Sequence, residues 1–265
     1  MPEGHTLHRL AAEYQRVFGG EAVRVSSPQG PFGPAALRLD GRVLGPAEAH
    51  GKNLFLGFEG VGWVHVHLGL YGKVRFGEGP APAPVGQVRL RIAAAEHYAD
   101  LRGPTTCALI SSFEKKDVQH RLGPDPLRAA DSSDPAWQRI SRSGTTVAAL
   151  LMDQKVLAGV GNIYRAELLF RARISPFRAG SEVPTADLEA IYKDAGVLMR
   201  HGMVDRRIVT TKPKDRPHKK GEPLDEEVHY VYRRQGKPCF ICGTKILTKP
   251  MASRNLFWCP TCQVE

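Results

Sequence analysis

Four cysteines near the end of the chain constrain its fold more than any other feature. Cys239, Cys242, Cys259 and Cys262 follow a C-x2-C-x16-C-x2-C spacing. Each C-x2-C pair can direct two thiolates at one ion, and the intervening segment has a length that fits a β-hairpin. The spacing therefore predicts one closed, tetrahedral zinc site. Two disulfides or four unrelated thiols are the alternative interpretations.

The start of the chain shows no export signal. Its first residues include His5, His8 and Arg9 instead of an apolar segment. We therefore expect reduced thiols with bound metal, in a soluble cytosolic protein. No stretch approaches the roughly 20 consecutive apolar residues of a membrane span. Cys107 stands alone and is interpreted as a small buried hydrophobe.

The charge of the chain indicates the kind of partner that it binds. The 265 residues carry a formal charge of +10, and 42% are hydrophobic, enough for two or three packed domains. From Asp205 onward, 13 Lys and Arg stand against 7 Asp and Glu, so this segment supplies +6. A basic surface joined to a zinc module favours a phosphate-bearing partner, and a merely solvated surface is the alternative. A membrane is disfavoured because no amphipathic stretch adjoins the Lys cluster.

Periodicity separates a β-rich first half from a helical second half. Apolar residues recur at helical spacing between Gly4 and Gly19, which predicts a helix. From Val23 to about Ile110, short apolar or alternating runs separated by Gly and Pro predict an antiparallel sheet domain, with a surface loop at 77–84.

The second half predicts helices and a loop. Helices are expected over 147–156, 163–173 and about 185–201, and a mobile loop over 205–227 because this segment is charged and poor in large apolar residues. The turn at 158–162 contains two glycines, which let the backbone approach another molecule closely, and the next helix directs its positive end there. This turn is a candidate phosphate site, although such turns also occur simply as connections.

The N-terminus carries a possible nucleophile. Pro2 follows Met1, and removal of Met1 would leave a secondary amine that condenses with an aldehyde to an iminium ion. Glu3 could exchange protons beside it. Both residues could equally be an ordinary chain terminus.

Six segments together resemble one family, formamidopyrimidine-DNA glycosylase and endonuclease VIII. They are Met1-Pro2-Glu3-Gly4, Gly51-Lys52-x-Leu54, His67-Leu68-Gly69-Leu70-Tyr71-Gly72, Leu122-Gly123-Pro124-Asp125-Pro126-Leu127, Met152-Asp153-Gln154 through Gly161-Asn162-Ile163-Tyr164 to Glu167, and the four-cysteine finger. The resemblance runs from residue 2 to residue 262 in the family's order. The opening residues are similar to actinobacterial members of the endonuclease VIII branch.

The resemblance implies an α+β multidomain fold. It consists of an N-terminal helix with a two-sheet antiparallel β-sandwich as the catalytic domain (1–122), a linker (123–137), a helix-two-turn-helix domain that binds DNA (138–227) and a β-hairpin zinc finger (228–265). The implied protein is a monomer that binds damaged DNA.

The resemblance also implies a bifunctional glycosylase and abasic-site lyase of base excision repair. Pro2 would attack C1′ and displace the damaged base, Glu3 would be the general acid and base, and Lys52 would lie beside the amine. The resulting Schiff base would undergo β- and δ-elimination. Zinc would be purely structural.

Four further residues match DNA-contacting positions of the family. Asn162 and Arg254 correspond to a pair that grips phosphates near the lesion. Leu70 and Arg102 correspond to residues that fill the gap left by the displaced base. Such contacts are needed because extruding a base costs a few kcal/mol.

The chain departs from the family pattern at three places. Thr6 replaces a carboxylate, Pro104 stands where an aromatic residue is usual, and Leu70 replaces the longer Met of one branch. A weaker wedge favours lesions in single strands or bubbles, where little stacking must be broken. The branch resemblance favours oxidised pyrimidines, such as 5-hydroxyuracil or thymine glycol.

Three other functions are weighed against this one. A basic zinc-finger protein could hold nucleic acid without chemistry, and a member of the same fold could bind damaged DNA with weak or no catalysis. A zinc hydrolase is the third, and it is disfavoured because four thiolates leave no coordination position for water.

Overall fold

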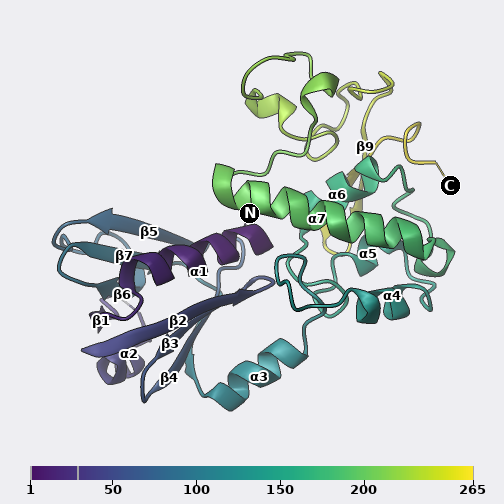
Figure 1. Cartoon of the computed structure of the whole chain (residues 1–265). Helices are drawn as coiled ribbons and strands as arrows, with labels where there is room; N and C mark the ends of the chain where they lie inside the picture. Colours follow the sequence, from purple (N-terminus) through teal and green to yellow (C-terminus); the bar gives the residue numbers. More distant parts are fainter. Residues whose placement is uncertain (1, 29, 265) are drawn as a thin grey trace. The chain divides into compact units, whose positions relative to one another are not determined.

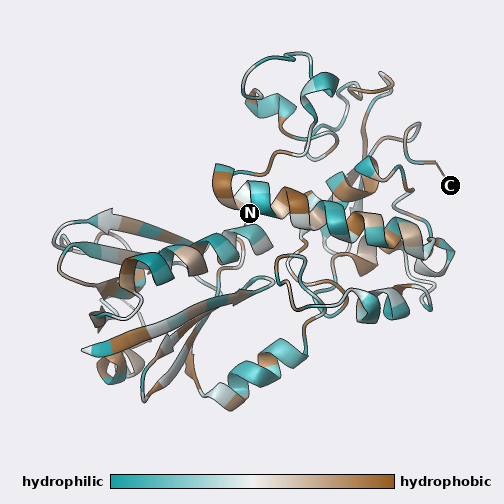
Figure 2. Cartoon of the chain, viewed as in Figure 1, coloured by the Kyte–Doolittle hydropathy of each residue, from teal (hydrophilic) through white to brown (hydrophobic). Residues whose placement is uncertain are grey.

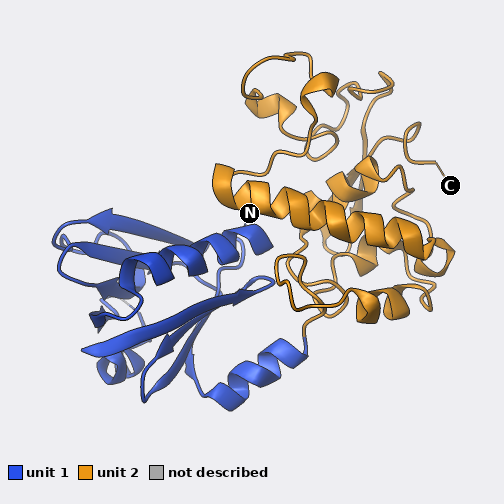
Figure 3. Ribbon diagram, in the orientation of Figure 1, with its two compact units in different colours: residues 1–121 blue, residues 122–265 orange. Residues whose placement is uncertain are grey.

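The chain forms two compact units in a computed structural model that describes residues 2–28 and 30–264. The units comprise residues 1–121 and 122–265 (Figure 3). The segments that the sequence predicts as linker, helix-two-turn-helix domain and zinc finger all belong to the second unit. Met1, whose removal would free the amine of Pro2, lies outside the described residues. In the described part of the chain, no helix combines the length and apolar character needed to cross a membrane.

The first unit begins with α1 (Gly4–Phe18), which confirms the predicted helix. Its buried face includes Leu7, Leu10, Tyr14 and Phe18, spaced three or four residues apart as an amphipathic helix requires. The helix ends at Gly19, whose N–H donates to Gln15 O at 3.0 Å.

Eight antiparallel strands follow, and they confirm the predicted sheet domain. They are β1 (Ala22–Ser26), β2 (Arg42–His50), β3 (Asn53–Phe58), β4 (Gly62–His67), β5 (Lys73–Glu78), β6 (Val88–Ala93), β7 (His97–Arg102) and β8 (Thr106–Ile110). Their order is β5-β7-β6-β1-β2-β3-β4-β8. Strand β1 pairs with β2 at Ala22 and Val23 and with β6 beyond them, so it is common to two layers that share one apolar core with α1 (Figure 1).

Two helices of this unit are absent from the sequence predictions, α2 (Gly33–Leu39) and α3 (Ser112–His120). Helix α3 buries Lys115, whose ammonium lies 3.3 Å from the centre of the Trp63 ring, and so lacks the apolar stripe that periodicity detects. A signal was present, because Ser111 and Glu114 form a capping box.

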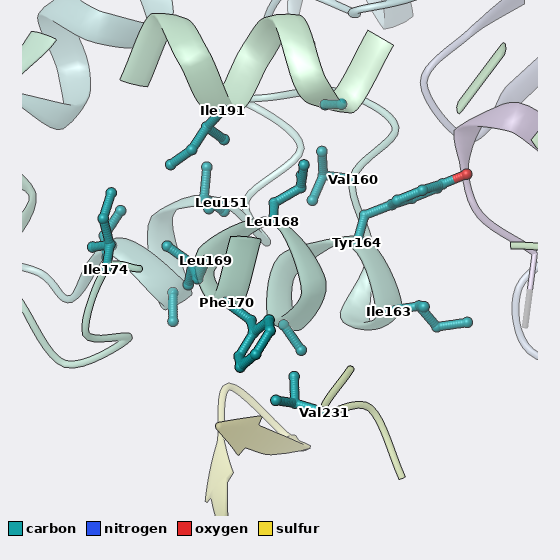
Figure 4. Packing of buried hydrophobic residues seen from close by; sticks show 14 of the residues in the cluster. Leu151, Val160, Ile163, Tyr164, Leu168, Leu169, Phe170, Ile174, Ile191 and Val231 are labelled. Carbon is teal, nitrogen blue, oxygen red and sulfur yellow. The ribbon is translucent and has the colours of Figure 1, made fainter. Parts of the chain in front are cut away.

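The second unit is built around helix α6. Its helices are α4 (Asp134–Ile140), α5 (Val147–Leu150), α6 (Asn162–Arg171) and α7 (Thr185–Asp205), with short 3-10 turns η1 (Gly180–Glu182), η2 (Pro213–Asp215) and η3 (Asp225–Glu227) and a hairpin of β9 (Leu247–Met251) and β10 (Arg254–Trp258). Leu168, Leu169 and Phe170 of α6 pack with Ile191 of α7 and with Val231 (Figure 4). Apolar and polar residues alternate along α7, as expected for a helix that covers a core on one side (Figure 2).

The helix predicted over 147–156 is wrong, because α5 ends at Leu150. The side chain of Asp153 accepts from Lys155 N at 2.9 Å, and that of Gln154 donates to Val160 O at 2.9 Å. Such local bonds give the backbone an alternative to the helix. The other two predicted helices correspond to α6 and α7, which reaches Asp205. Helix α4 begins inside the predicted linker.

The segment predicted as a mobile loop, 205–227, contains η2 and η3 and is tied by buried polar groups. The carboxylate of Glu227 accepts from His218 N at 3.0 Å and from Leu224 N at 3.1 Å. Thr211 Oγ1 donates to Glu227 O at 2.6 Å and accepts from Arg216 Nε at 2.8 Å. This segment is therefore an organised loop.

A single carboxylate joins α6 to the chain that leads into the finger. Glu167 is fully buried and accepts hydrogen bonds from Tyr230 N at 2.7 Å, from Val231 N at 2.8 Å and from Tyr232 N at 2.8 Å. Thr210 Oγ1 also donates to it. Four donors together offset the cost of burying this polar group.

Glu167→Gln tests this junction. The amide keeps one acceptor oxygen but turns an NH2 group toward backbone donors, so we expect a loss of about 3 kcal/mol in the free energy of unfolding. Urea unfolding measures it, with the exposed Glu189→Gln on α7 as a control that changes little. A loss below about 0.5 kcal/mol would show that the junction is not stabilising.

Candidate functional site

In the first unit, the start of α1 and the turn between β2 and β3 lie at the same end (Figure 1). At the other end of the helix, Gly20 N donates to Leu44 O at 2.7 Å, and Gln15 Oε1 accepts from Ala47 N at 2.8 Å. The helix and β2 therefore run in opposite directions side by side, which brings Glu3 toward the turn that carries Lys52. Glu3 precedes the first helical residue in extended conformation, and its side chain does not cap the helix.

Lys52 occupies the second position of a two-residue hairpin turn. His50 and Asn53 are paired across the strands, so the turn consists only of Gly51 and Lys52. Gly51 has φ +57°, and a glycine at the first central position is what a type II′ turn requires. The ammonium is thereby carried on a short, well-defined support.

His67 lies next to this turn and was not among the predicted site residues. It ends β4 and pairs with Asn53. Burial lowers the pKa of His67 from its usual 6.5, and the charge of Lys52 lowers it further. The imidazole is therefore neutral at neutral pH and can donate one hydrogen bond. The sequence signal was its place directly before the Leu68-Gly69-Leu70 motif.

The loop after His67 presents two apolar side chains to solvent. Leu70 is 46% exposed, and Tyr71, which the sequence analysis did not single out, is 85% exposed. The turn closes through Gly72 N and Leu68 O at 3.0 Å.

The neighbouring loop, 103–105, packs against this one. Thr105 N donates to His67 O at 2.9 Å, and Thr105 Oγ1 would lie 1.9 Å from a Cβ placed on Gly69, so only glycine fits there. Pro104 is buried. Arg102 ends β7 opposite Lys73, the first residue after the exposed loop. The structure thus brings Leu70 and Arg102 to the same end of this unit.

In the second unit, a shaped turn precedes helix α6. Gln154 holds it from inside, because its side chain accepts from Gly159 N at 3.1 Å and donates to Val160 O at 2.9 Å. Gly159 has φ +89°, which glycine adopts readily. The first N–H groups of α6, with the positive end of its dipole, give the turn the character of an anion site.

Asn162 and the strand of Arg254 are tied together. Asn162 Nδ2 donates to Asn255 O at 3.0 Å, and Asn162 Oδ1 accepts from Arg165 Nη2. Arg254 follows a turn whose residues Ala252 and Ser253 have φ of 51° and 58°, the left-handed values of a type I′ turn that glycine or asparagine usually occupies. The two predicted phosphate-contacting residues therefore belong to one connected structure.

The four cysteines bind one structural zinc ion. Their sulfurs all lie within 4.8 Å of one another. Cys239 Sγ is 3.9 Å from Cys262 Sγ, and Cys242 Sγ is 3.4 Å from Cys259 Sγ. Zn–S bonds of about 2.3 Å in a tetrahedron place sulfurs about 3.8 Å apart, so the set fits. Among the described residues, no other group of three or more His, Cys, Asp or Glu side chains is placed to hold a metal.

Family models match three segments of the chain. They are the formamidopyrimidine-DNA glycosylase N-terminal domain (residues 1–107), the H2TH domain of the same glycosylase (122–213) and the zinc finger found in FPG and IleRS (236–264).

Among curated proteins, the chain is 50% identical over 270 residues to Endonuclease 8 1 of Mycobacterium tuberculosis, covering 99% of this chain and 100% of that protein. It is 31% identical over 239 residues to the formamidopyrimidine-DNA glycosylase of Shigella dysenteriae, covering 88% and 87%. A solved complex of a Lactococcus lactis FPG mutant with Fapy-dG-containing DNA matches over 100% of both chains with a TM-score of 0.81 at 19% identity, a likeness of fold.

Removal of zinc tests the role of the cysteine site. Because Cys239 and Cys259 belong to the same apolar core as Leu256, stripping the metal with a chelator should unfold the hairpin and lower DNA affinity at least tenfold. Zinc content should be one ion per chain and should stay so in the control Cys107→Ala. A metal-free protein with unchanged DNA affinity would contradict this role.

Proposed function

The chain belongs to the formamidopyrimidine-DNA glycosylase and endonuclease VIII family of glycosylases and abasic-site lyases that act in base excision repair, and from this premise we propose that it excises oxidised pyrimidines through a Schiff base on Pro2. The observation that supports the proposal is that Glu3, which follows Pro2 in the chain, precedes α1 at the same end of the first unit as the turn that carries Lys52. The 50% identity to a protein named Endonuclease 8 1 supports the endonuclease VIII branch, and the resemblance to that branch favours oxidised pyrimidines.

The proposed reaction begins once Met1 has been removed. The secondary amine of Pro2 attacks C1′, the glycosidic bond breaks, and the base leaves with a proton. Glu3 supplies protons as general acid, including the proton that opens the sugar ring at O4′. The positive end of α1 and the Lys52 ammonium disfavour protonation of the amine, which keeps its lone pair available. A type II′ turn holds Lys52 in this position without a flexible loop.

The iminium then draws electrons from the sugar. Loss of a proton from C2′ expels the 3′ phosphate, and loss of a proton from C4′ expels the 5′ phosphate. The strand is thereby cut on both sides by β- and δ-elimination. No step requires the zinc ion, whose four ligands are all protein thiolates.

DNA is held by separate groups in each unit. Asn162, the first N–H groups of α6 and Arg254 would contact phosphates on one connected surface. In the first unit, His67 and Lys52 would contact the phosphate beside the lesion, because a neutral imidazole still donates one hydrogen bond. We propose that the protein works as a monomer on bacterial DNA.

A catalytically weak DNA-binding protein of the same fold is the second candidate. Thr6 favours it, because a hydroxyl cannot replace the acid and base function of a carboxylate. Thr6 Oγ1 lies 3.2 Å from His5 Nε2, and burial lowers the pKa of His5 to about 4. The neighbouring imidazole is therefore neutral, and Glu3 remains the proposed acid.

Variants of Pro2 and Glu3 distinguish an active glycosylase from a catalytically weak DNA-binding protein. Glu3→Gln should lower the rate of base excision at least about 100-fold, the usual contribution of a general acid, and affect cleavage of a preformed abasic site far less. Pro2→Gly should weaken borohydride trapping, because glycine offers a primary amine in place of the secondary amine. The exposed Glu21→Gln is the matched control. If both variants react like the parent protein, the assigned roles are wrong.

The exposed loop predicts a preference for unpaired DNA. Leu70 and Tyr71 form the proposed wedge. Pro104 stands where the family usually has an aromatic residue, and it is buried, so it adds no aromatic ring to the wedge. We expect faster excision of 5-hydroxyuracil from single strands or bubbles than from a full duplex, where stacking must be broken. Tyr71→Ala should lower the duplex rate about tenfold and the single-strand rate much less, since base–aromatic stacking contributes about 1–3 kcal/mol.

The control for this comparison is Val85→Ala, which truncates another exposed apolar residue in the same unit. Equal or higher activity of the parent protein on duplex DNA would contradict the preference. An equal loss on both substrates in Tyr71→Ala would contradict the wedge.

A further inference from the structure

The side chain of Asn53 bridges the turn that carries Lys52, and the proposed reaction does not use it. Asn53 is the first residue of β3, and it pairs across the turn with His50, the last residue of β2. Its Nδ2 donates to His50 O at 3.3 Å. The amide therefore joins the two residues between which Gly51 and Lys52 lie.

A second hydrogen bond fixes the orientation of this amide. His65 on β4 lies diagonally opposite Asn53, and its Nε2 is 2.9 Å from Asn53 Oδ1. Burial lowers the pKa of His65 to about 4, and the charges of His67 and Arg121 lower it further, so the imidazole is neutral at neutral pH. Because Oδ1 can only accept, the single N–H of this imidazole is on Nε2 and donates to Asn53.

The donor is itself held in place by packing. The His65 ring stacks on the ring of Phe55, with centroids 5.0 Å apart and an angle of 15° between the planes. Phe55 is fully buried and lies on the strand that begins with Asn53. Contacts from Phe55 through His65 and Asn53 to His50 O thus connect the turn to the buried part of the sheet.

The turn needs such support because it contains a glycine. Gly51 adopts φ +57° readily, but glycine also allows more backbone conformations than any other residue. Lys52 follows directly, and its ammonium is at the end of a long side chain, so a small rotation of the turn moves the charge considerably. The amide of Asn53 restricts this rotation because it holds the two ends of the turn together.

We propose that Asn53 is a positioning residue that, held by His65, keeps the turn in the geometry that directs the Lys52 ammonium toward the N-terminal amine and the phosphate beside the lesion. The inference rests on the proposed function, in which Lys52 lies beside the amine of Pro2. Misplacing a group at the reacting centre by about 1 Å can cost about 100-fold in rate, so the loss of this bridge has a measurable effect.

A double-mutant cycle with Lys52 tests the inference. The rate of borohydride-trapped adduct formation is measured in single turnovers, with a saturating single-stranded abasic oligonucleotide and well below the melting temperatures, for the parent protein, Asn53→Ala, Lys52→Ala and the double variant. Asn53→Ala should lower the rate about tenfold, less than a full 1 Å displacement would. In the Lys52→Ala background it should lower the rate less than about twofold, because the group that it positions is gone. Equal losses in both backgrounds overturn the inference.

Two replacements of His65 distinguish the hydrogen bond from the packing of the ring, and they test the inference even if Asn53→Ala does not fold. His65→Phe keeps a ring against Phe55 but removes the donor, so the rate should fall about threefold. His65→Gln loses the ring but again offers an N–H to Asn53, so its rate should stay within about twofold of the parent rate. The reverse order overturns the inference. The exposed His120→Gln is the control that keeps the parent rate.

Failure of the proposed function gives a different result. A parent protein that forms no adduct with the abasic oligonucleotide after Met1 has been removed refutes the reaction itself. A parent protein that forms the adduct, while Asn53→Ala reacts equally fast, refutes only the inference.

Discussion

The buried carboxylate of Glu167 is the interaction on which the second unit depends. It extends from the middle of α6 and accepts three successive backbone N–H groups at Tyr230, Val231 and Tyr232. Three fixed donors determine where that segment runs, and the zinc finger begins a few residues later at Cys239. Because the desolvation cost of a carboxylate is offset only when all its donors are in place, the junction has essentially one favourable geometry.

That geometry also affects the surface that we propose to contact DNA. The finger hairpin lies where Asn162 can donate to the backbone of Asn255, beside Arg254. The N-terminus of α6 and the hairpin are thus connected without DNA, which would reduce the ordering cost of the proposed phosphate contacts. In the first unit, turns of one sheet hold the proposed site residues, because Lys52, His67 and the loop of Leu70 and Tyr71 all lie at strand ends.

Sequence patterns predicted those parts whose cause is local. Helix α1 was predictable because its apolar residues alone decide its buried face, and the zinc site because thiolate spacing alone decides its geometry. The helix predicted over 147–156 failed because side-chain bonds from Asp153 and Gln154 outcompete helical periodicity. Helix α3 was missed because a lysine, rather than an apolar stripe, packs it onto Trp63.

The candidate site divides in the same way. Pro2 and Glu3 could be proposed from the sequence, because an amine and a carboxylate at the terminus fit the chemistry and the family resemblance implies their roles. Tyr71 could not, because its exposure depends on how the loop closes at Gly72. Asn53 gave no sequence signal, because its hydrogen bond forms only when the sheet places His65 of the neighbouring strand beside it.

The central claim is that the N-terminal proline becomes covalently bound to deoxyribose. It is tested most directly by digesting the borohydride-reduced complex with an abasic oligonucleotide and locating the modified peptide by mass spectrometry. The account predicts that the sugar remnant is attached to the nitrogen of Pro2 in a chain that lacks Met1. A remnant attached to Lys52 or to any other side chain, or a protein without an adduct after Met1 has been removed, would contradict it.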